Sequence, residues 1–163
     1  MSMKTVVVYY SMGGNVAWCA EKIAEKTGAD VLRIEPEKAY PAHGFKKFLF
    51  GGKSALSAEA PKLAPYVFDA AAYDRVILGM PVWAGCVTPP MRTFIEENRE
   101  ALCGKSFAAF LCASGGAGKV FDKTEELLGS KLVAKVCLLD PKSRPKAENE
   151  EKLAAFCETC LTA

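Results

Sequence analysis

Histidine is almost absent from this sequence, and neither sign of charge dominates it. The chain of 163 residues has one histidine and a formal net charge of only +2. The lone His43, without evident partner residues, is a poor basis for general-base catalysis. The small net charge and the lack of a long basic run also exclude the footprint of a nucleic-acid-binding protein.

Long hydrophobic runs are missing as well. No apolar stretch approaches the length of a membrane-spanning helix, so we expect no membrane association. The few apolar residues after Lys4 fit a strand better than a signal peptide. The seven cysteines are an odd number scattered through apolar segments, which favours reduced thiols and a cytoplasmic location over a disulfide framework.

The composition that remains is that of an ordinary globular protein. Hydrophobic residues make up 50% of the chain and charged residues 25%. A chain of this length predicts a single domain, over residues 1–163, that can bury a sizeable core without disulfides or a metal.

Strand-like and helix-like segments alternate along the chain. Apolar, β-branched runs predict strands over residues 4–10, 30–36, 73–81, 106–114 and 131–139. Helical spacing predicts helices from the first strand to Gly28 and over residues 89–102, 118–128 and 147–161. Because parallel strands need long crossovers, this alternation predicts a doubly wound α/β sandwich that binds ligands beyond the carboxyl ends of its strands.

A long excursion interrupts this order over residues 36–72. The spacing of Phe45, Phe48, Leu49 and Leu56 is roughly helical but is broken by two glycines, which predicts a broken helix between loops. An excursion of this length at the ligand end fits either a functional segment or a plain surface insertion, and both interpretations stay open.

The segment after the first strand, Ser11 to Val16, reads SMGGNV. A strand, a glycine turn and a helix start gather several backbone N–H groups around one point, where the helix dipole adds positive charge. Ser11 and Asn15 contribute polar side chains. The segment therefore fits an anion cradle, although a plain strand-to-helix turn would also need glycine and an asparagine.

Two further loops follow the third and fourth strands. The first, GMPVWAGCVTPP, surrounds a lone Trp83 with glycines and prolines, so its indole either offers a flat face to a planar ring or folds back onto the core. The second, CASGGAGK, is small and glycine-rich, which fits either backbone contact with a flat heterocycle or a flexible turn. Together, the three loops describe a site for a mononucleotide with a large planar ring.

Two short motifs suggest other chemistry and are disfavoured. Residues 86–93 match the Cys-x5-Arg-Thr pattern of cysteine phosphatases, but Pro89 and Pro90 lack the N–H groups that a phosphate cradle needs. Cys157 and Cys160 form a C-x-x-C on the apolar stripe of the last helix, where packing explains them better than zinc does.

The three loops resemble those of the flavodoxin-like FMN-binding proteins. YYSMGGNV is similar to the family's phosphate loop, usually Ser-x-Thr-Gly-Asn-Thr, and LGMPVWAG is similar to the Gly-x-Pro-x-Trp-x-Gly loop of a short-chain branch. ASGG is similar to that branch's third loop. The resemblance implies a three-layer α/β/α sandwich around a five-stranded parallel sheet of order 2-1-3-4-5, the order that this fold class shows for flavodoxin.

The resemblance also implies FMN as cofactor and a set of residues that hold it. The residues that would bind the phosphate are Ser11, Met12, Gly13, Gly14, Asn15 and Val16. Those that would border the flavin ring are Pro81, Val82, Trp83, Ala84, Gly85, Ser114, Gly115 and Gly116. Gly13 and Val16 stand where the family usually has threonines, and the loss of two hydroxyl groups predicts weakened FMN binding.

Two functions are consistent with this pattern. The first is an FMN-dependent electron carrier or oxidoreductase of the NAD(P)H or quinone type, with a redox partner or acceptor that the sequence does not identify. The alternative is a flavodoxin-like module with weak or lost FMN binding that acts through protein contacts. Its contact surfaces would include Trp18, expected on the exposed face of the first helix, and residues 43–57. A homodimer is open under either function.

Overall fold

The computed structural model of the protein describes residues 3–40 and 60–163. Its centre is a five-stranded sheet in the order β2-β1-β3-β4-β5, in which every neighbouring pair is parallel. The sandwich and strand order that the sequence resemblance implied are therefore confirmed. The strands are β1 Thr5–Tyr9, β2 Asp30–Arg33, β3 Arg75–Pro81, β4 Ser106–Ala113 and β5 Leu132–Leu139.

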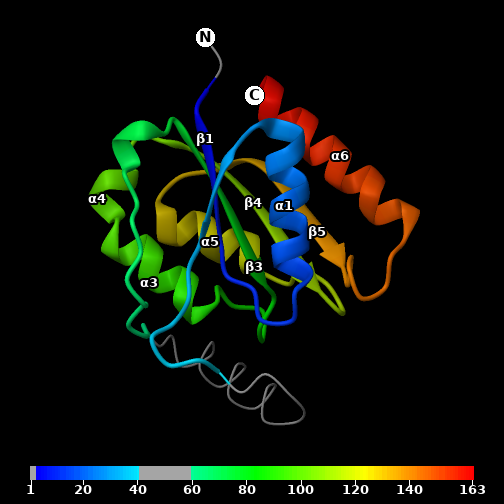
Figure 1. The fold of residues 1–163 in the computed structure, drawn as a ribbon, viewed down its shortest axis with the longest axis horizontal. Helices are drawn as coiled ribbons and strands as arrows, with labels where there is room; N and C mark the ends of the chain where they lie inside the picture. Colours follow the sequence, from blue (N-terminus) through cyan, green and yellow to red (C-terminus); the bar gives the residue numbers. More distant parts are fainter. Residues whose placement is uncertain (1–2, 41–59) are drawn as a thin grey trace.

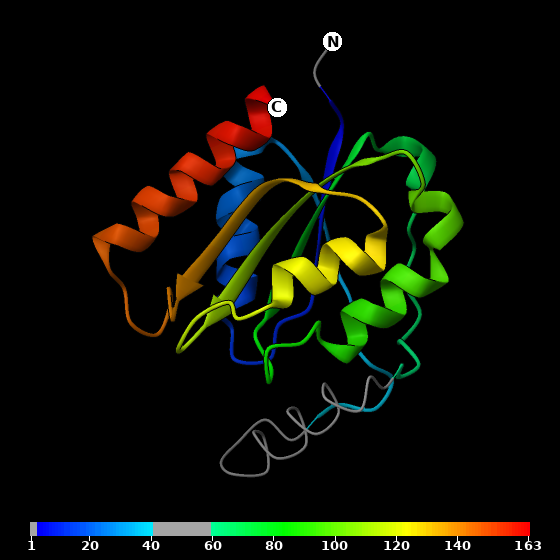
Figure 2. The same ribbon diagram turned by 180° about the vertical axis from the view of Figure 1, so that it is seen from behind.

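Helices cover both faces of the sheet, as Figures 1 and 2 show from opposite sides. Helices α1 and α6 pack on one face, and α3, α4 and α5 pack on the other. Their bounds are α1 Asn15–Thr27, α3 Pro89–Glu97, α4 Arg99–Leu102, α5 Val120–Leu128 and α6 Ala147–Thr162, with a short 3₁₀ turn η1 at Ala70–Ala72. Among the described residues, no helix is long and apolar enough to cross a membrane.

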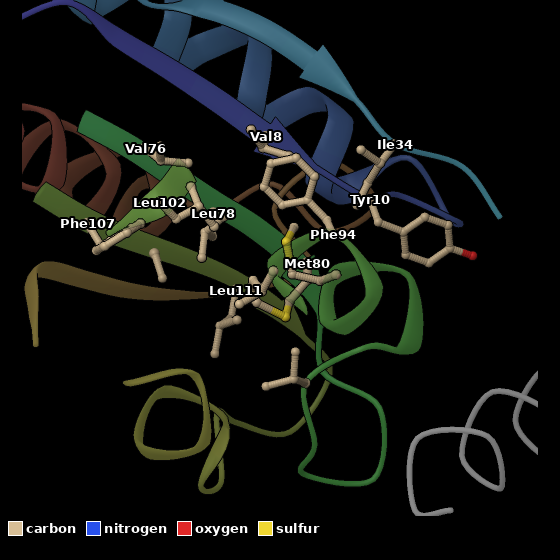
Figure 3. Close-up of a cluster of buried hydrophobic side chains, with 14 of the residues drawn as sticks. Val8, Tyr10, Ile34, Val76, Leu78, Met80, Phe94, Leu102, Phe107 and Leu111 are labelled. Carbon is tan, nitrogen blue, oxygen red and sulfur yellow. The ribbon is translucent and has the colours of Figure 1, made fainter. Parts of the chain in front are cut away.

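Successive residues of each central strand point alternately into two hydrophobic clusters, one on each face of the sheet. In β1, Val6 and Val8 point to the cluster beneath α3, α4 and α5, whereas Val7 and Tyr9 point to the cluster beneath α1 and α6. Figure 3 shows the first cluster, with Tyr10 at one end and Phe107 at the other. Burial on both faces explains why the sequence of β1 is apolar throughout instead of alternating.

Helix α1 ends where the sequence indicated. Gly28 adopts a left-handed conformation (φ 73°) and donates its N–H to the carbonyl of Ala24. Trp18, however, is half-buried against the second cluster, with the Lys22 ammonium 5.8 Å from the centre of its ring. The expectation of an exposed tryptophan was wrong, because the apolar stripe of α1 is wide enough to include it.

The single helix expected over residues 89–102 is two helices. It begins as predicted, with prolines in the first turn of α3, but the chain leaves helical geometry at Asn98 (φ −107°, ψ 16°). The Asn98 side-chain amide donates hydrogen bonds to the carbonyl of Phe94 and to the hydroxyl of Tyr66, both at 2.8 Å. A side chain that competes for a backbone carbonyl in this way favours a break in the helix.

The excursion between β2 and β3 is closed at its base. Pro36 and Leu63 form an antiparallel bridge, supported by hydrogen bonds from Glu37 N–H to the Lys62 carbonyl (2.8 Å) and from Ala64 N–H to the Glu35 carbonyl (2.9 Å). The broken helix predicted around Phe45 to Leu56, and His43 with it, lies outside the described residues.

Cys157 and Cys160 lie buried in the second cluster, 2% and 6% exposed, as the packing interpretation predicted. Within residues 3–40 and 60–163, no group of three or more histidine, cysteine or acidic side chains could hold a metal ion.

Candidate functional site

The loops after β1, β3 and β4 meet at the carboxyl edge of the sheet and enclose a cavity of about 210 Å³. Nine of the residues predicted from sequence line it: Met12, Gly13, Asn15, Val16, Pro81, Val82, Trp83, Ala84 and Ser114. Three further residues, Cys112, Ala113 and Asp140, also line it and were not expected. The predicted residues Ser11, Gly14, Gly85, Gly115 and Gly116 lie in the same loops but outside the lining.

The first loop leaves a run of backbone donors without partners. Among the described residues, no acceptor is hydrogen-bonded to the N–H groups of residues 12–16, which span the turn and the start of α1. Gly14, at the N-cap of α1, has a left-handed conformation (φ 89°) and no side chain to cap the helix. Consecutive free amides at the positive end of a helix form a binding site for an anion.

Ser11 caps α1 from inside the protein. Its side chain is buried, 3% exposed, and its hydroxyl oxygen accepts a hydrogen bond from the Ala17 N–H at 3.2 Å. The carbonyl of Ser11 accepts a second bond, at 3.0 Å, from the Arg33 guanidinium at the end of β2. These contacts hold the loop in place and leave the hydroxyl proton of Ser11 free to donate.

Asn15 connects the first loop to the segment after β5. Its side-chain oxygen accepts hydrogen bonds from the backbone N–H groups of Lys142 (2.9 Å) and Ser143 (3.2 Å). The sequence indicated Asn15 as a residue of the cradle but gave no sign of this partner. The segment after β5 lacks a glycine motif, and only the pairing of β5 with β4 brings it to the cavity.

Trp83 stands half-buried at the side of the cavity. Its indole makes nearly perpendicular contacts with Tyr10 (centroids 5.6 Å apart, 87°) and Tyr40 (5.3 Å, 85°). Two such edge-to-face contacts fix the plane of the ring while Trp83 still lines the cavity. Burial, and next the charge of Glu35, raises the pKa of Tyr10 well above its usual value, so this phenol stays neutral.

A tight turn carries the loop past Trp83. The Cys86 N–H donates to the Trp83 carbonyl at 3.0 Å, and the two residues between them, Ala84 (φ 51°) and Gly85 (φ 66°), are both left-handed. This conformation is natural for Gly85 but strained for Ala84. Cys86 is buried, and its sulfur lies 3.2 Å from the Lys123 ammonium nitrogen.

The far side of the cavity carries a carboxylate. The Ser114 hydroxyl donates to Asp140 Oδ1 at 3.2 Å, and the Asp140 N–H donates to the Ala113 carbonyl at 3.0 Å. Asp140 is itself left-handed (φ 45°), a conformation that aspartate tolerates better than most residues. A sequence signal existed, since an acidic residue directly after a strand of a parallel sheet falls at this edge.

Several known proteins are similar to this chain in sequence or in fold. The flavodoxin family model matches residues 4–160. A flavoprotein of Lactobacillus acidophilus, solved in complex with FMN, is 22% identical, with a TM-score of 0.72 over 86% of this chain and 95% of that one. The apo form of the flavoprotein from that organism matches with a TM-score of 0.63 at 20% identity, over 84% of this chain and 93% of that one.

A flavodoxin also shares the fold. Two-electron reduced flavodoxin of Megasphaera elsdenii matches with a TM-score of 0.57 at 18% identity, over 98% of this chain and 99% of that one. At these identities the structural likeness extends to the fold alone, whereas the family match spans nearly the whole chain.

Proposed function

Since this chain belongs to the flavodoxin family, we propose that it binds FMN at the carboxyl edge of its sheet and works as a flavoprotein in electron transfer. The observation that carries the proposal is the run of backbone N–H groups of residues 12–16, which have no hydrogen-bond partner among the described residues, beside the cavity that Trp83 lines. The first feature suits a phosphate and the second a planar ring. The flavoprotein of similar fold from Lactobacillus acidophilus was solved with FMN.

The donor set fits the two ends of FMN. The amides of residues 12–16 supply several donors with no competing side chain among the described residues, and Gly13 and Gly14 let an anion approach the main chain. The indole of Trp83 supplies an apolar wall, and the Asp140 carboxylate can accept hydrogen bonds from hydroxyl groups.

FMN, when bound, supplies the redox chemistry, in steps of one or two electrons. The task of the chain is then to bind and orient the cofactor and to exclude water from one side of it. Of the described residues that line the cavity, only Asp140 and Cys112 have ionisable side chains, and Cys112 is a buried thiol whose pKa is raised by the neighbouring Cys19 thiol and by burial. The proposal therefore needs no side chain as acid or base.

Trp83→Ala tests the ring contact. We expect the purified protein to quench FMN fluorescence saturably, and the variant to bind FMN about ten- to a hundredfold more weakly because stacking on an aromatic ring is lost. Trp18→Ala is the matched control, because Trp18 lies on α1, half-buried against the second cluster, and does not line the cavity.

Two results would contradict the proposal. Wild-type protein that leaves FMN fluorescence unchanged at high concentration would support the alternative module that acts through protein contacts. If Trp83→Ala and Trp18→Ala weaken FMN binding equally, the flavin ring does not bind beside Trp83 in the cavity.

A further inference from the structure

A lysine from the segment after β5 lies against the phosphate loop. A Cβ built on Gly14 would lie 3.4 Å from the ammonium nitrogen of Lys142 and 3.8 Å from its Cδ. The side chain therefore runs along Gly14, a position of the loop that has no side chain of its own. Its charged end reaches the N-cap of α1.

The backbone of Lys142 is held in this position. Its N–H donates to the Asn15 side-chain oxygen at 2.9 Å, and that of Ser143 donates to the same oxygen at 3.2 Å. The Arg144 N–H closes the turn on the Asp140 carbonyl at 2.7 Å. The backbone of the lysine is thus hydrogen-bonded to the first residue of α1.

The Lys142 ammonium has no ion-pair partner among the described residues. The charged groups around the phosphate loop and the cavity are already engaged. Arg33 pairs with Glu35 and bonds the Ser11 carbonyl, and the Asp140 carboxylate lies 3.2 Å from the Ser114 hydroxyl and 4.0 Å from Arg144.

This placement is unfavourable unless an anion is present. The N-terminus of a helix carries roughly half a positive charge, so a cation there is repelled. Here an ammonium lies beside the helix start and the amides of residues 12–16, and none of these groups has a partner in the part of the chain that the structure describes. All of these groups favour the same occupant, a group with negative charge and several acceptor oxygens.

We propose that Lys142 binds the phosphate of FMN together with the loop amides, in place of the hydroxyls missing at Gly13 and Val16; this inference rests on the proposed function. Lys142 then determines specificity: it favours the phosphorylated flavin over riboflavin, which has the same ring system and no phosphate. It also makes part of the affinity depend on ionic strength, because an exposed ammonium is screened by salt.

Lys142→Met removes the charge and keeps most of the side-chain length. By titration of flavin fluorescence at low ionic strength, we expect this variant to bind FMN about tenfold more weakly, because a charge-assisted bond to phosphate is lost. Its riboflavin affinity should match that of the wild type within about twofold. Lys142→Arg should retain most of the FMN affinity, since guanidinium also binds phosphate.

Lys26→Met is the matched control. Lys26 is exposed in the last turn of the same helix, so this variant changes the net charge equally at the opposite end of α1. It should leave both affinities unchanged. Added salt should weaken FMN binding more steeply in the wild type and in Lys26→Met than in Lys142→Met.

Thermal unfolding without flavin separates a ligand contact from a structural role. Removal of a repelled cation should leave the melting temperature of Lys142→Met equal to or above that of the wild type. A lower melting temperature, with FMN and riboflavin weakened alike, would assign Lys142 to the folded structure and overturn the inference.

The remaining outcomes are also decisive. Wild-type protein that binds FMN, with Lys142→Met binding it equally well, overturns the role of Lys142 and leaves the proposed function standing. Wild-type protein that binds riboflavin as tightly as FMN excludes a phosphate site, although a flavin site survives. Wild-type protein that binds neither flavin overturns both proposals.

Discussion

Gly79 belongs to a sequence motif of the proposed flavin site, but core packing explains why this position is a glycine. It is the first glycine of the Gly-x-Pro-x-Trp-x-Gly segment, and close approach of a cofactor would be one explanation for it. In the structure, a Cβ on Gly79 would overlap the ring of Phe110, which is fully buried on the neighbouring strand β4. The glycine therefore makes room for an aromatic side chain of the core.

Gly79→Ala should destabilise the protein by about 1–3 kcal/mol, because a rigid, buried ring cannot move aside without strain. In a Phe110→Leu background the same change should cost less, since the overlap is relieved. Urea unfolding of the four proteins measures both values. Gly115→Ala is the control, because a Cβ there meets nothing within 4 Å; additive effects at Gly79 and Phe110 would contradict the explanation.

At the scale of elements, Glu125 connects helix α5 to strand β5. Its side chain is 7% exposed and accepts hydrogen bonds from the Leu132 N–H (3.1 Å) and from the ammonium groups of Lys135 (2.7 Å) and Lys131 (3.0 Å). The Lys135 ammonium, with the Leu132 N–H and Lys131, lowers the pKa of Glu125 to about 2. One carboxylate thus holds the helix end against the start of the next strand.

The lowered pKa predicts a pH dependence of stability. Because the folded protein holds this carboxylate ionised more strongly than the unfolded chain does, its contribution is full above the unfolded pKa of about 4.3. It is lost as the pH falls from about 5 towards the folded value of about 2. Urea unfolding at pH 6 and pH 3 should show a smaller loss of stability in Glu125→Gln than in the wild type.

The control for this prediction is Glu148→Gln. Glu148 pairs with Lys152 on the exposed surface of α6, with 68% of its side chain accessible, so its removal should change the pH dependence little. Equal slopes for the wild type and Glu125→Gln would show that the contact between α5 and β5 does not depend on this charge.

The break between helices α3 and α4 shows a limit of prediction from the sequence. The helix expected over residues 89–102 breaks at Asn98, whose side chain binds Tyr66 from the far end of the excursion. Tyr66 in turn donates to Glu97 at 2.7 Å, and burial, followed by that contact, raises its pKa to about 12. The contact between Asn98 and Tyr66 spans more than 30 positions, so it has no local signal in the sequence.

For the whole molecule, FMN should act as a stabilising ligand. The loops that would hold it extend from three strands and from the start of α1, so occupancy links most of the sheet. At a hundredfold excess over the dissociation constant, binding to the folded state alone adds about 2.7 kcal/mol. For a chain of this size that corresponds to a rise in melting temperature of about 5–10 °C.

Thermal denaturation followed by circular dichroism measures this rise. Adenosine monophosphate, which has a phosphate and a different ring, is the control and should raise the melting temperature less. A melting temperature that does not respond to saturating FMN would contradict binding to the folded state.

The sequence by itself determined the α/β architecture, and it determined which loops lie at the carboxyl edge of the sheet. Strands buried on both faces are continuously apolar, amphipathic helices repeat at a period near 3.6, and glycine marks sharp turns, so each of these signals is local. For that reason the α/β order, Gly28 as the end of α1 and Trp83 at the edge of the sheet could be predicted from the chain alone.

Only the tertiary structure decided which residues beyond these loops meet at the cavity. Asp140 and Lys142 follow β5, and they reach the phosphate loop because β5 pairs with β4 and Asn15 binds the turn that follows. Contacts of this sort depend on how the strands pair in space, which no local pattern of residues encodes.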